Sequence, residues 1–291
     1  NGDPLAGKPV SIAVAGDTVY QSSVPVTGTV SLGLSAADGT ATTALTATTT
    51  GVRTITATGD GIPLAEPAEV AFTAGAVDAA ASTLDSDRIT VIANGTAFAT
   101  LTATLYDSYG HPVPGKTVLI QADGTGLVLE QPLTVSDAGG QVQATLRAAE
   151  VQDVRVIAID QTDGVTLTQA VTVTFIAGPA DPTQSGATIT PTTVIADGVQ
   201  TAAITATLRD ASGHPAAGRP VQLVVDGTDN TITPAAQGVT GDSGQAVFHL
   251  ASTRAEVKNV SVRDVDNNVT IPAGTVTFVS GIVDPAASSL T

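Results

Sequence analysis

Two histidines and two aspartates in a repeated motif are the residues of this chain best placed to do chemistry. His111 and His214 hold the same place in two copies of Asp-x-x-Gly-His-Pro, which begin at Asp107 and Asp210. A zinc site or a catalytic triad would need further ligands or a nucleophile beside them. Turn chemistry accounts for the motif without either, because Asp bonds the backbone ahead of it and Gly supplies a positive φ. We therefore interpret both histidines as solvated turn residues and both aspartates as turn stabilisers.

The other polar candidates also favour structural roles. His249 alternates with apolar neighbours and is expected on a strand surface. Asp137 and Asp242 lie in hairpin-turn sequences, where we predict turn-stabilising aspartates. The alternating ligands and final bidentate Glu of an EF-hand calcium loop do not occur. Three further aspartates in linker sequences would be the better place for a calcium ion, because two domains could contribute oxygens there: Asp78, Asp181 and Asp284.

Lysines before two strands invite a covalent interpretation. Lys8 and Lys116 occupy matching positions, and stalk domains of Gram-positive bacteria can carry Lys–Asn cross-links. The third copy has Arg219 in that position, and a guanidinium cannot form such an amide. We predict an electrostatic or packing role for this position. No glycine-rich phosphate loop and no paired carboxylates in a cleft are indicated. The sequence therefore predicts no catalytic, cofactor-binding or metal-binding residues, and no enzyme.

Elements that would position these residues recur with a fixed period. Phe72, Phe175 and Phe278 are spaced by 103 residues, as are the two Asp-x-x-Gly-His-Pro motifs. A period near 100 is too long for a solenoid repeat and fits a complete small domain. Within each copy, Leu or Ala alternates with Thr, which is typical of half-buried antiparallel strands. We predict an all-β fold of tandem Ig-like antiparallel β-sandwiches, arranged as an extended rod.

Composition limits the classes of function. The chain has 291 residues, a formal net charge of −16 and a pI near 4.2, which argues against binding nucleic acid or an anionic membrane through a basic surface. It has no Cys and no Trp, so disulfides, thiolate metal sites and Cys nucleophiles are excluded and the core must be aliphatic. Neither an 18-residue apolar stretch nor a signal peptide is evident. An extracellular protein of this sequence would be a fragment of something larger.

Domain boundaries follow from the repeated linker phrase. We predict the C-terminal part of a first repeat at 1–75, a second repeat at 76–178, a third at 179–281 and the opening segment of a fourth at 282–291. The linkers are short and contain Pro or β-branched residues, so we expect them to be stiff. The first copy has no equivalent of residues 76–109, which leaves a sheet edge and part of its core uncovered. Either the sequence is a trimmed piece of a longer array, or the tail of one molecule packs on the first copy of the next; the contact residues would be Val10, Ile12 and Leu290.

Several motifs of the second and third copies resemble the bacterial Ig-like domain, group 1. They are Ile92-Ala93-Asn94-Gly95, Asp107-Ser108-Tyr109-Gly110-His111-Pro112 and Asp137-Ala138-Gly139-Gly140-Gln141, and then Ile195-Ala196-Asp197-Gly198, Asp210-Ala211-Ser212-Gly213-His214-Pro215 and Asp242-Ser243-Gly244-Gln245. The resemblance implies immunoglobulin-like sandwiches without the disulfide and its packed Trp. It also implies tandem stalks of the intimin/invasin group of outer-membrane adhesins.

This resemblance implies a structural function. The repeats would form the stalk of a bacterial cell-surface adhesin and project an adhesive tip, with other domains of the same adhesin and a host or neighbouring-cell receptor as partners. One alternative is that a repeat binds a glycan or host protein directly; Tyr106 and Tyr109 are the only close aromatic pair, replaced by Arg209 and Ser212 in the third copy. A further alternative is an accessory module of a secreted enzyme. The sequence does not identify a receptor.

Overall fold

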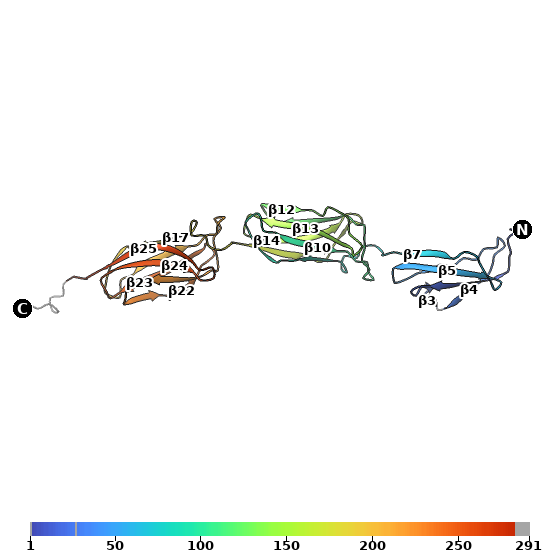
Figure 1. Ribbon diagram of the computed structural model, residues 1–291, viewed down its shortest axis with the longest axis horizontal. Coiled ribbons are helices and arrows are strands. Elements are labelled where there is room, and N and C mark those ends of the chain that lie inside the picture. The colour runs from blue at the N-terminus through green and yellow to red at the C-terminus, as the bar shows by residue number, and fades with distance from the viewer. Residues whose placement is uncertain (1, 27, 283–291) are drawn as a thin grey trace, which may run out of the picture.

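Three all-β units follow one another along the chain and form an elongated rod (Figure 1). The computed structural model describes residues 2–26 and 28–282. Each unit is joined to the next by one linker segment (Figure 1). The predicted all-β fold and rod arrangement are confirmed. No helix among the described residues is long and apolar enough to cross a membrane.

The second unit is a sandwich of two sheets. One sheet has the order β12-β13-β10-β8 and the other β11-β14-β16-β9, with β15 beside β14. All pairings are antiparallel except that of β9 with β16, which is parallel. Its strands are β8 (Thr83–Ser86), β9 (Thr90–Ile92), β10 (Ala99–Thr104), β11 (Val118–Asp123), β12 (Leu127–Glu130), β13 (Gln141–Ala148), β14 (Gln152–Asp160), β15 (Val165–Thr166) and β16 (Val171–Ile176).

The third unit repeats this sandwich. Its sheets have the orders β17-β19-β23-β21 and β18-β25-β24-β20-β22, and β18 pairs with β25 in parallel. Its strands are β17 (Gly186–Thr190), β18 (Thr193–Ile195), β19 (Ala202–Thr207), β20 (Pro220–Val225), β21 (Asn230–Thr233), β22 (Gln237–Val239), β23 (Gln245–Ser252), β24 (Val257–Asp264) and β25 (Val269–Val279).

The cores of these two units are aliphatic, as the composition requires. Leu101, Ala103 and Leu105 of the second unit are fully buried, and so is Phe175 on the opposite sheet. Phe278 takes the equivalent buried place in the third unit. Threonines on the other face of β10 are half-buried or buried, so that face is less exposed than the alternation alone predicts. The period-2 pattern nevertheless assigned the core face correctly.

The first unit has one main sheet instead of two. Its order is β4-β1-β5-β6, with β7 also paired to β5, and a small hairpin of β2 and β3 lies beside it. Its strands are β1 (Pro9–Ala15), β2 (Tyr20–Gln21), β3 (Val24–Pro25), β4 (Thr29–Leu34), β5 (Gly51–Gly59), β6 (Ile62–Pro63) and β7 (Ala68–Phe72). This sheet corresponds to the β11-β14-β16 sheet of the second unit, with β1 paired to β5 as β11 is paired to β14.

The core of the first unit is open. Ile12 and Val19 are its only buried apolar side chains among the described residues, and Phe72 is only partly buried. An open hollow of about 550 Å³ lies over the apolar side of the sheet. Its apolar lining comes from Leu5, Val10, Ile12, Leu32, Ala41, Ala57, Ile62 and Leu64. In the second unit, β10 and its neighbours cover the equivalent face.

Candidate functional site

The repeated Asp–His turns lie at the joints between units. At the joint between the second and third units, Asp210 is buried and its Oδ1 accepts bonds from the backbone N–H groups of Ser212 and His214, each at 2.9 Å. Its Oδ2 accepts the N–H of Gly178 at 2.8 Å. Gly178 belongs to the linker that enters the third unit. The aspartate therefore holds its own turn and the linker at the same time.

The joint between the first and second units has the same arrangement. Asp107 Oδ1 accepts the N–H groups of Tyr109 and His111, each at 2.9 Å. Asp107 Oδ2 accepts the N–H of Gly75 in the preceding linker, also at 2.9 Å. The interpretation of both aspartates as turn stabilisers is confirmed. The bond to the linker glycine could not be seen in the local motif, because its partners are 32 residues apart.

The environment of these carboxylates keeps them ionised. Burial raises the pKa of Asp107, but bonds from the N–H groups of Gly75 and His111 and from the His111 ring outweigh burial and hold this pKa well below its ordinary value. The pKa of Asp210 is lowered by the corresponding balance, in which burial opposes the bonds from Gly178 and His214. Each joint therefore contains a buried carboxylate that accepts hydrogen bonds as an anion.

The interpretation of His111 and His214 as solvated residues was wrong. Their side chains are only 20% and 14% exposed, and each Nδ1 lies against Oδ2 of the aspartate in the same turn, at 2.9 Å and 3.2 Å. The turn folds the ring back onto the carboxylate, because the histidine follows the aspartate by four residues. His249 is exposed on β23, as predicted.

The remaining candidate aspartates are divided between turns and linkers. Asp137 Oδ1 accepts the N–H groups of Gly139 and Gln141 at 2.8 and 2.9 Å, which confirms its turn role. The prediction for Asp242 was wrong: Gly241 takes the place of Asp137, since its N–H and carbonyl close the third unit's turn onto Gln245 and Gly244. Asp242 follows one residue later and makes no side-chain hydrogen bond within the described chain.

The linker aspartates stabilise the backbone that follows them. Asp78 Oδ1 accepts the N–H groups of Ala80 and Ala81 at 2.8 and 2.9 Å. Asp181 Oδ1 accepts both the N–H and the hydroxyl of Thr183. Asp284 lies outside the described residues. Within residues 2–26 and 28–282, no group of three or more His, Cys, Asp or Glu side chains could hold a metal ion.

The Lys/Arg position makes electrostatic contacts, as predicted. Lys8 Nζ lies 2.8 Å from Asp60, and Lys116 Nζ lies 2.7 Å from Asp163. Arg219 differs, because its Nη2 donates to the backbone carbonyl of Gly178 at 2.9 Å. In the third unit this position therefore reaches the joint.

The tyrosine pair is split by the fold. Tyr106 is half-buried beside Pro112 in a short bridge, whereas the side chain of Tyr109 is largely exposed at the joint, with its ring centroid 6.2 Å from that of His111. Tyr109 lines a hollow of about 400 Å³ between the first two units, together with Thr49 and Thr50 of the first. The structure brings Tyr109 and the Asp–His pair together, and it leaves Tyr106 out of this hollow.

Buried cations near the unit ends were missed by sequence reasoning. Arg53 is 2% exposed and Lys258 is fully buried, and their charged groups lie 5.8 and 5.9 Å from the ring centroids of Phe72 and Phe278. Strand register places Arg53 and Lys258 at equivalent positions, and Val154 occupies this position in the second unit. Each of the three pairs with a valine on the next strand: Arg53 with Val70, Lys258 with Val276 and Val154 with Val173. Alternating charged residues on a strand normally indicate an exposed face. Alignment with Val154 was the signal that could have revealed them.

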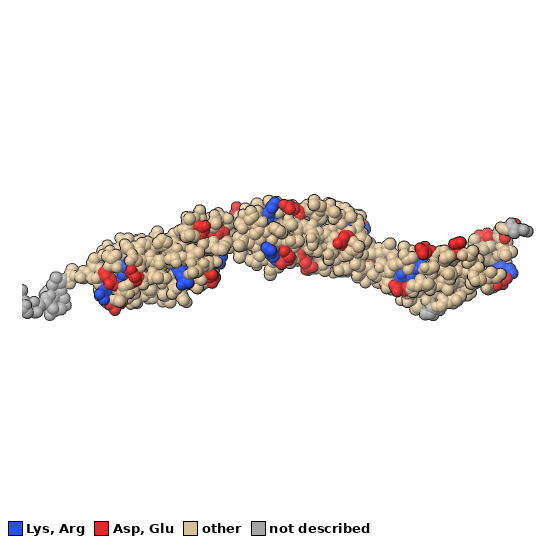
Figure 2. All heavy atoms as spheres, viewed as in Figure 1, with Lys and Arg blue, Asp and Glu red and all other residues tan. Residues whose placement is uncertain are grey.

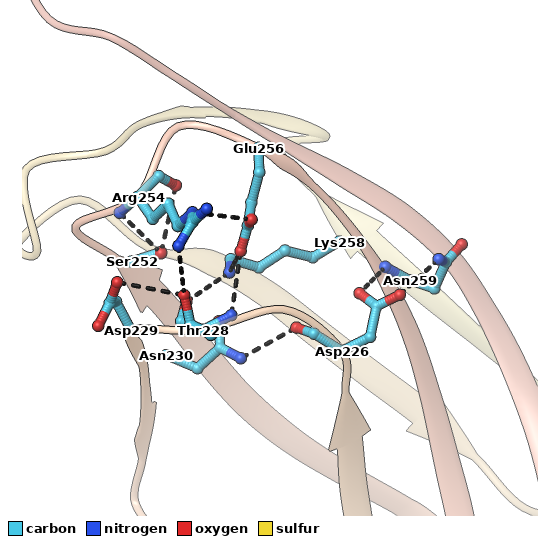
Figure 3. Close-up of polar contacts among 9 residues, drawn as sticks. All are labelled: Asp226, Thr228, Asp229, Asn230, Ser252, Arg254, Glu256, Lys258 and Asn259. Carbon is cyan, nitrogen blue, oxygen red and sulfur yellow. Dashed lines mark hydrogen bonds and ion pairs between the residues drawn. The ribbon is translucent and has the colours of Figure 1, made fainter.

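An equivalent loop in the second and third units is held by different side chains. In the second unit, the Gln152 amide accepts the N–H of Thr125 at 3.0 Å and donates to its carbonyl at 2.7 Å. In the third, the Glu256 carboxylate accepts the N–H of Thr228, while Lys258 Nζ donates to the carbonyl of Thr228 at 2.7 Å (Figure 3). Lys258 also pairs with Glu256 at 2.6 Å. A neutral amide is thus replaced by an ion pair with the same hydrogen-bonding pattern.

Charges on the outer surface are sparse and mixed. On the face in Figure 2, acidic and basic side chains lie in small groups separated by uncharged surface along all three units. No basic patch is visible on this face. With a net charge of −16, this surface is unlike the concentrated positive surface that nucleic-acid binding requires.

Sandwiches in tandem with bonded joints define an array of immunoglobulin-like domains. The family model of the bacterial Ig-like domain (group 1) matches residues 81–176 and 184–279. The chain therefore belongs to this family. The recognition made from the sequence motifs is confirmed.

The most similar proteins found include bacterial adhesins. The inverse autotransporter adhesin YeeJ of Escherichia coli (strain K12) is 28% identical over 294 residues, which cover 100% of this chain and 12% of YeeJ. The chain thus spans about an eighth of that relative's length. The crystal structure of invasin, a bacterial integrin-binding protein, matches with a TM-score of 0.66 and 22% identity, covering 96% of this chain and 54% of the invasin chain.

A second solved adhesin shares the fold. The Escherichia coli adhesin FdeC matches with a TM-score of 0.64 and 22% identity, covering 96% of this chain and 88% of the FdeC chain. At this identity the two structures support the fold alone. The chain is thus an array containing group 1 bacterial Ig-like domains, related in sequence to YeeJ.

Proposed function

We propose that this chain is a stalk segment of a bacterial cell-surface adhesin. The observation that carries the proposal is the end-to-end arrangement of the units, with each linker bonded to the following unit through a buried aspartate. In an array built in this way, each added unit increases the distance between the two ends. Its relatedness to an inverse autotransporter adhesin supports a place at the cell surface. Its partners there are the other domains of the same adhesin, and a host or neighbouring-cell receptor is the target of the adhesive tip.

The proposed organisation follows the repeat boundaries. Residues 1–75 are the C-terminal part of a first repeat, 76–178 and 179–281 are the second and third repeats, and 282–291 open a fourth. Each complete repeat adds about 35–45 Å to the rod, given strands of about seven residues with a rise of ~3.3 Å plus end loops and linker. Joined units of this kind need no metal, cofactor or catalytic residue to work.

Deleting one repeat from the parent adhesin tests the stalk function. Removal of residues 76–178 brings Gly75 in front of Pro179, and thereby preserves one linker and its aspartate. We expect the purified chain to shorten by about 35–45 Å in small-angle scattering, and adhesion to decrease while isolated tip binding stays unchanged. Duplicating 76–178 provides the matched lengthened variant. Adhesion that is independent of repeat number would contradict the stalk function.

Direct recognition by the array is the second candidate function. It is favoured by one observation, the exposed Tyr109 beside the hollow between the first two units. Aromatic side chains at such a surface are suited to stacking on a sugar ring or to anchoring a protein partner. Tyr109→Ala should then abolish binding of the isolated chain to host cells or to a glycan array. Tyr109→Phe is the matched control.

The open face of the first unit supports a proposal about self-contact. Val10 and Ile12 line the uncovered hollow, as a head-to-tail contact requires, whereas Leu290 lies outside the described residues. Such a contact joins molecules in rows and does not close a dimer. Sedimentation velocity at increasing concentration should then show growing oligomers that are lost on removal of 284–290. A monomer at all concentrations would exclude the contact.

A further inference from the structure

We propose that the two joints differ in stiffness: the joint between the second and third units is locked, and the joint between the first and second is a hinge. The inference rests on differences in side chains and burial at the two linkers, and it holds whether or not the array acts as a stalk. It also replaces the expectation that both linkers are stiff because they are short and contain Pro or β-branched residues.

The linker into the third unit is held by side chains on both sides of Gly178. Asp210 accepts the Gly178 N–H at 2.8 Å, and Arg219 donates to the Gly178 carbonyl at 2.9 Å. Gly178 itself is buried, and the Cγ2 of Ile92, from the second unit, lies 3.4 Å from where a Cβ would be. Rotation at this joint would break two charge-assisted hydrogen bonds and expose packed surface.

At Gly75 itself, the linker into the second unit is held by one side chain. Asp107 accepts the N–H of Gly75, and no side chain among the described residues donates to the Gly75 carbonyl. Gly75 is exposed. Lys116, which occupies the position of Arg219, pairs with Asp163 of its own unit instead. Bending at Gly75 therefore breaks fewer side-chain hydrogen bonds than rotation at Gly178.

A second substitution explains why Arg219 is available to the joint. The partner of Lys116, Asp163, corresponds to Asn267 in the third unit, and Asn267 donates to Asp264 Oδ2 at 3.0 Å. Arg219 has no carboxylate within ion-pair distance among the described residues. Its longer, forked guanidinium reaches the linker carbonyl, whereas the ammonium of Lys116 stays at its acidic partner.

The linker sequences and the hollows beside them also indicate that the joint between the second and third units is the stiffer one. Pro179 follows Gly178 and restricts φ, whereas Ala76 follows Gly75. A hollow of about 290 Å³ lies at the joint between the second and third units. Two hollows, of about 400 and 890 Å³, lie at the joint between the first and second. Domains that share little buried surface move relative to one another unless they are fixed by specific contacts.

Spin labels at equivalent positions measure this difference directly. The chain has no native cysteine, so the pairs Glu69→Cys with Thr172→Cys and Thr172→Cys with Thr275→Cys can be labelled without background. All three residues are exposed on the equivalent strands β7, β16 and β25. We expect the distance distribution across the joint between the first and second units (the first joint) to be about twice as wide as that across the joint between the second and third units (the second joint). Equal widths, or a wider distribution across the second joint, would overturn the proposal.

Exchanging the two side-chain pairs tests the cause. Lys116→Arg with Asp163→Asn gives the second unit the arrangement of the third and should narrow the first distribution. Arg219→Lys with Asn267→Asp makes the reverse exchange and should widen the second. Thermal unfolding checks that each variant is folded, and Arg219→Gln is the conservative alternative if the double variant is not. Widths that do not change in any folded variant would show that the Arg219 contact does not lock the joint.

Discussion

The first and second units contain the same central sheet, yet only the second has a closed core. In the first unit β5 pairs with β1 and β7. In the second unit β14 pairs in the same way with β11 and β16. In the second unit, the apolar side of this sheet packs against β10 and its neighbours. In the first, it faces an open hollow, and residues 41–46, which follow β4 as β23 follows β22, form no strand beyond one bridge. The same sheet therefore buries its apolar side only in the unit where β10 and its neighbours are present.

Replacing the equivalent phenylalanines should give the largest difference. Phe278→Ala is expected to cost about 3–5 kcal/mol of the third unit's unfolding free energy, because it leaves a cavity in a closed core. Phe72→Ala should cost clearly less, since that ring is only partly buried. Calorimetric melting of the two variants gives both values. The second unit's transition should stay unchanged, and loss of all units in one shared transition would contradict their independence.

Supplying the missing strands should close the first unit. Residues 76–109 placed directly before Gly2 keep the spacing of the second unit, in which Gly110 follows. We expect hydrogen exchange to slow at residues 41–46 and the first unit to melt at a higher temperature, since exposed apolar surface becomes buried. The same graft with Leu101→Asp and Leu105→Asp should give no protection. An equal effect of both grafts would contradict strand pairing as the cause.

Both joints should loosen only when the pH falls below the ordinary pKa of Asp. The lowered pKa values of Asp107 and Asp210 mean that their bonds contribute fully above the ordinary Asp pKa of about 3.9 and are lost as pH falls through the lower folded values. The scattering length of the rod should therefore stay constant between about pH 7 and pH 4. Asp107→Ala and Asp210→Ala are the matched variants that should already be loose at pH 7. A change in the unmodified rod near pH 5 would contradict this assignment.

Exchanging the buried lysine and its partner for their counterparts should have the smallest effect. Lys258→Val with Glu256→Gln installs the residues found at Val154 and Gln152, whose amide makes both bonds to the equivalent loop, and replacing a whole buried ion pair in this way ranges from neutral to a gain of about 1–4 kcal/mol. Glu256→Ala should destabilise the third unit instead, because it leaves Lys258 buried with only the Thr228 carbonyl. Urea unfolding of both variants makes the comparison. A large loss of stability in the double variant would show that the cation itself is required.

Much of the architecture was determined by the sequence alone. The 103-residue interval, the Leu/Ala–Thr alternation and the absence of Cys and Trp predicted tandem sandwiches with aliphatic cores. The Asp-x-x-Gly motif predicted its turns, because Asp107 and Asp210 bond backbone groups only a few residues ahead. Local chemistry of this kind can be read from neighbouring residues, since the partners are close in the chain.

Only the tertiary structure decided how the units are joined and which charges are buried. The bond from Asp210 to Gly178 and the contact of Arg219 with the same glycine depend on segments 32 and 41 residues apart. Burial of Lys258 depends on strand register, which places it beside Phe278 on the core side. Long-range pairing, and not local preference, determined each of these features, because hydrogen bonds and burial in a sheet come from residues distant in sequence.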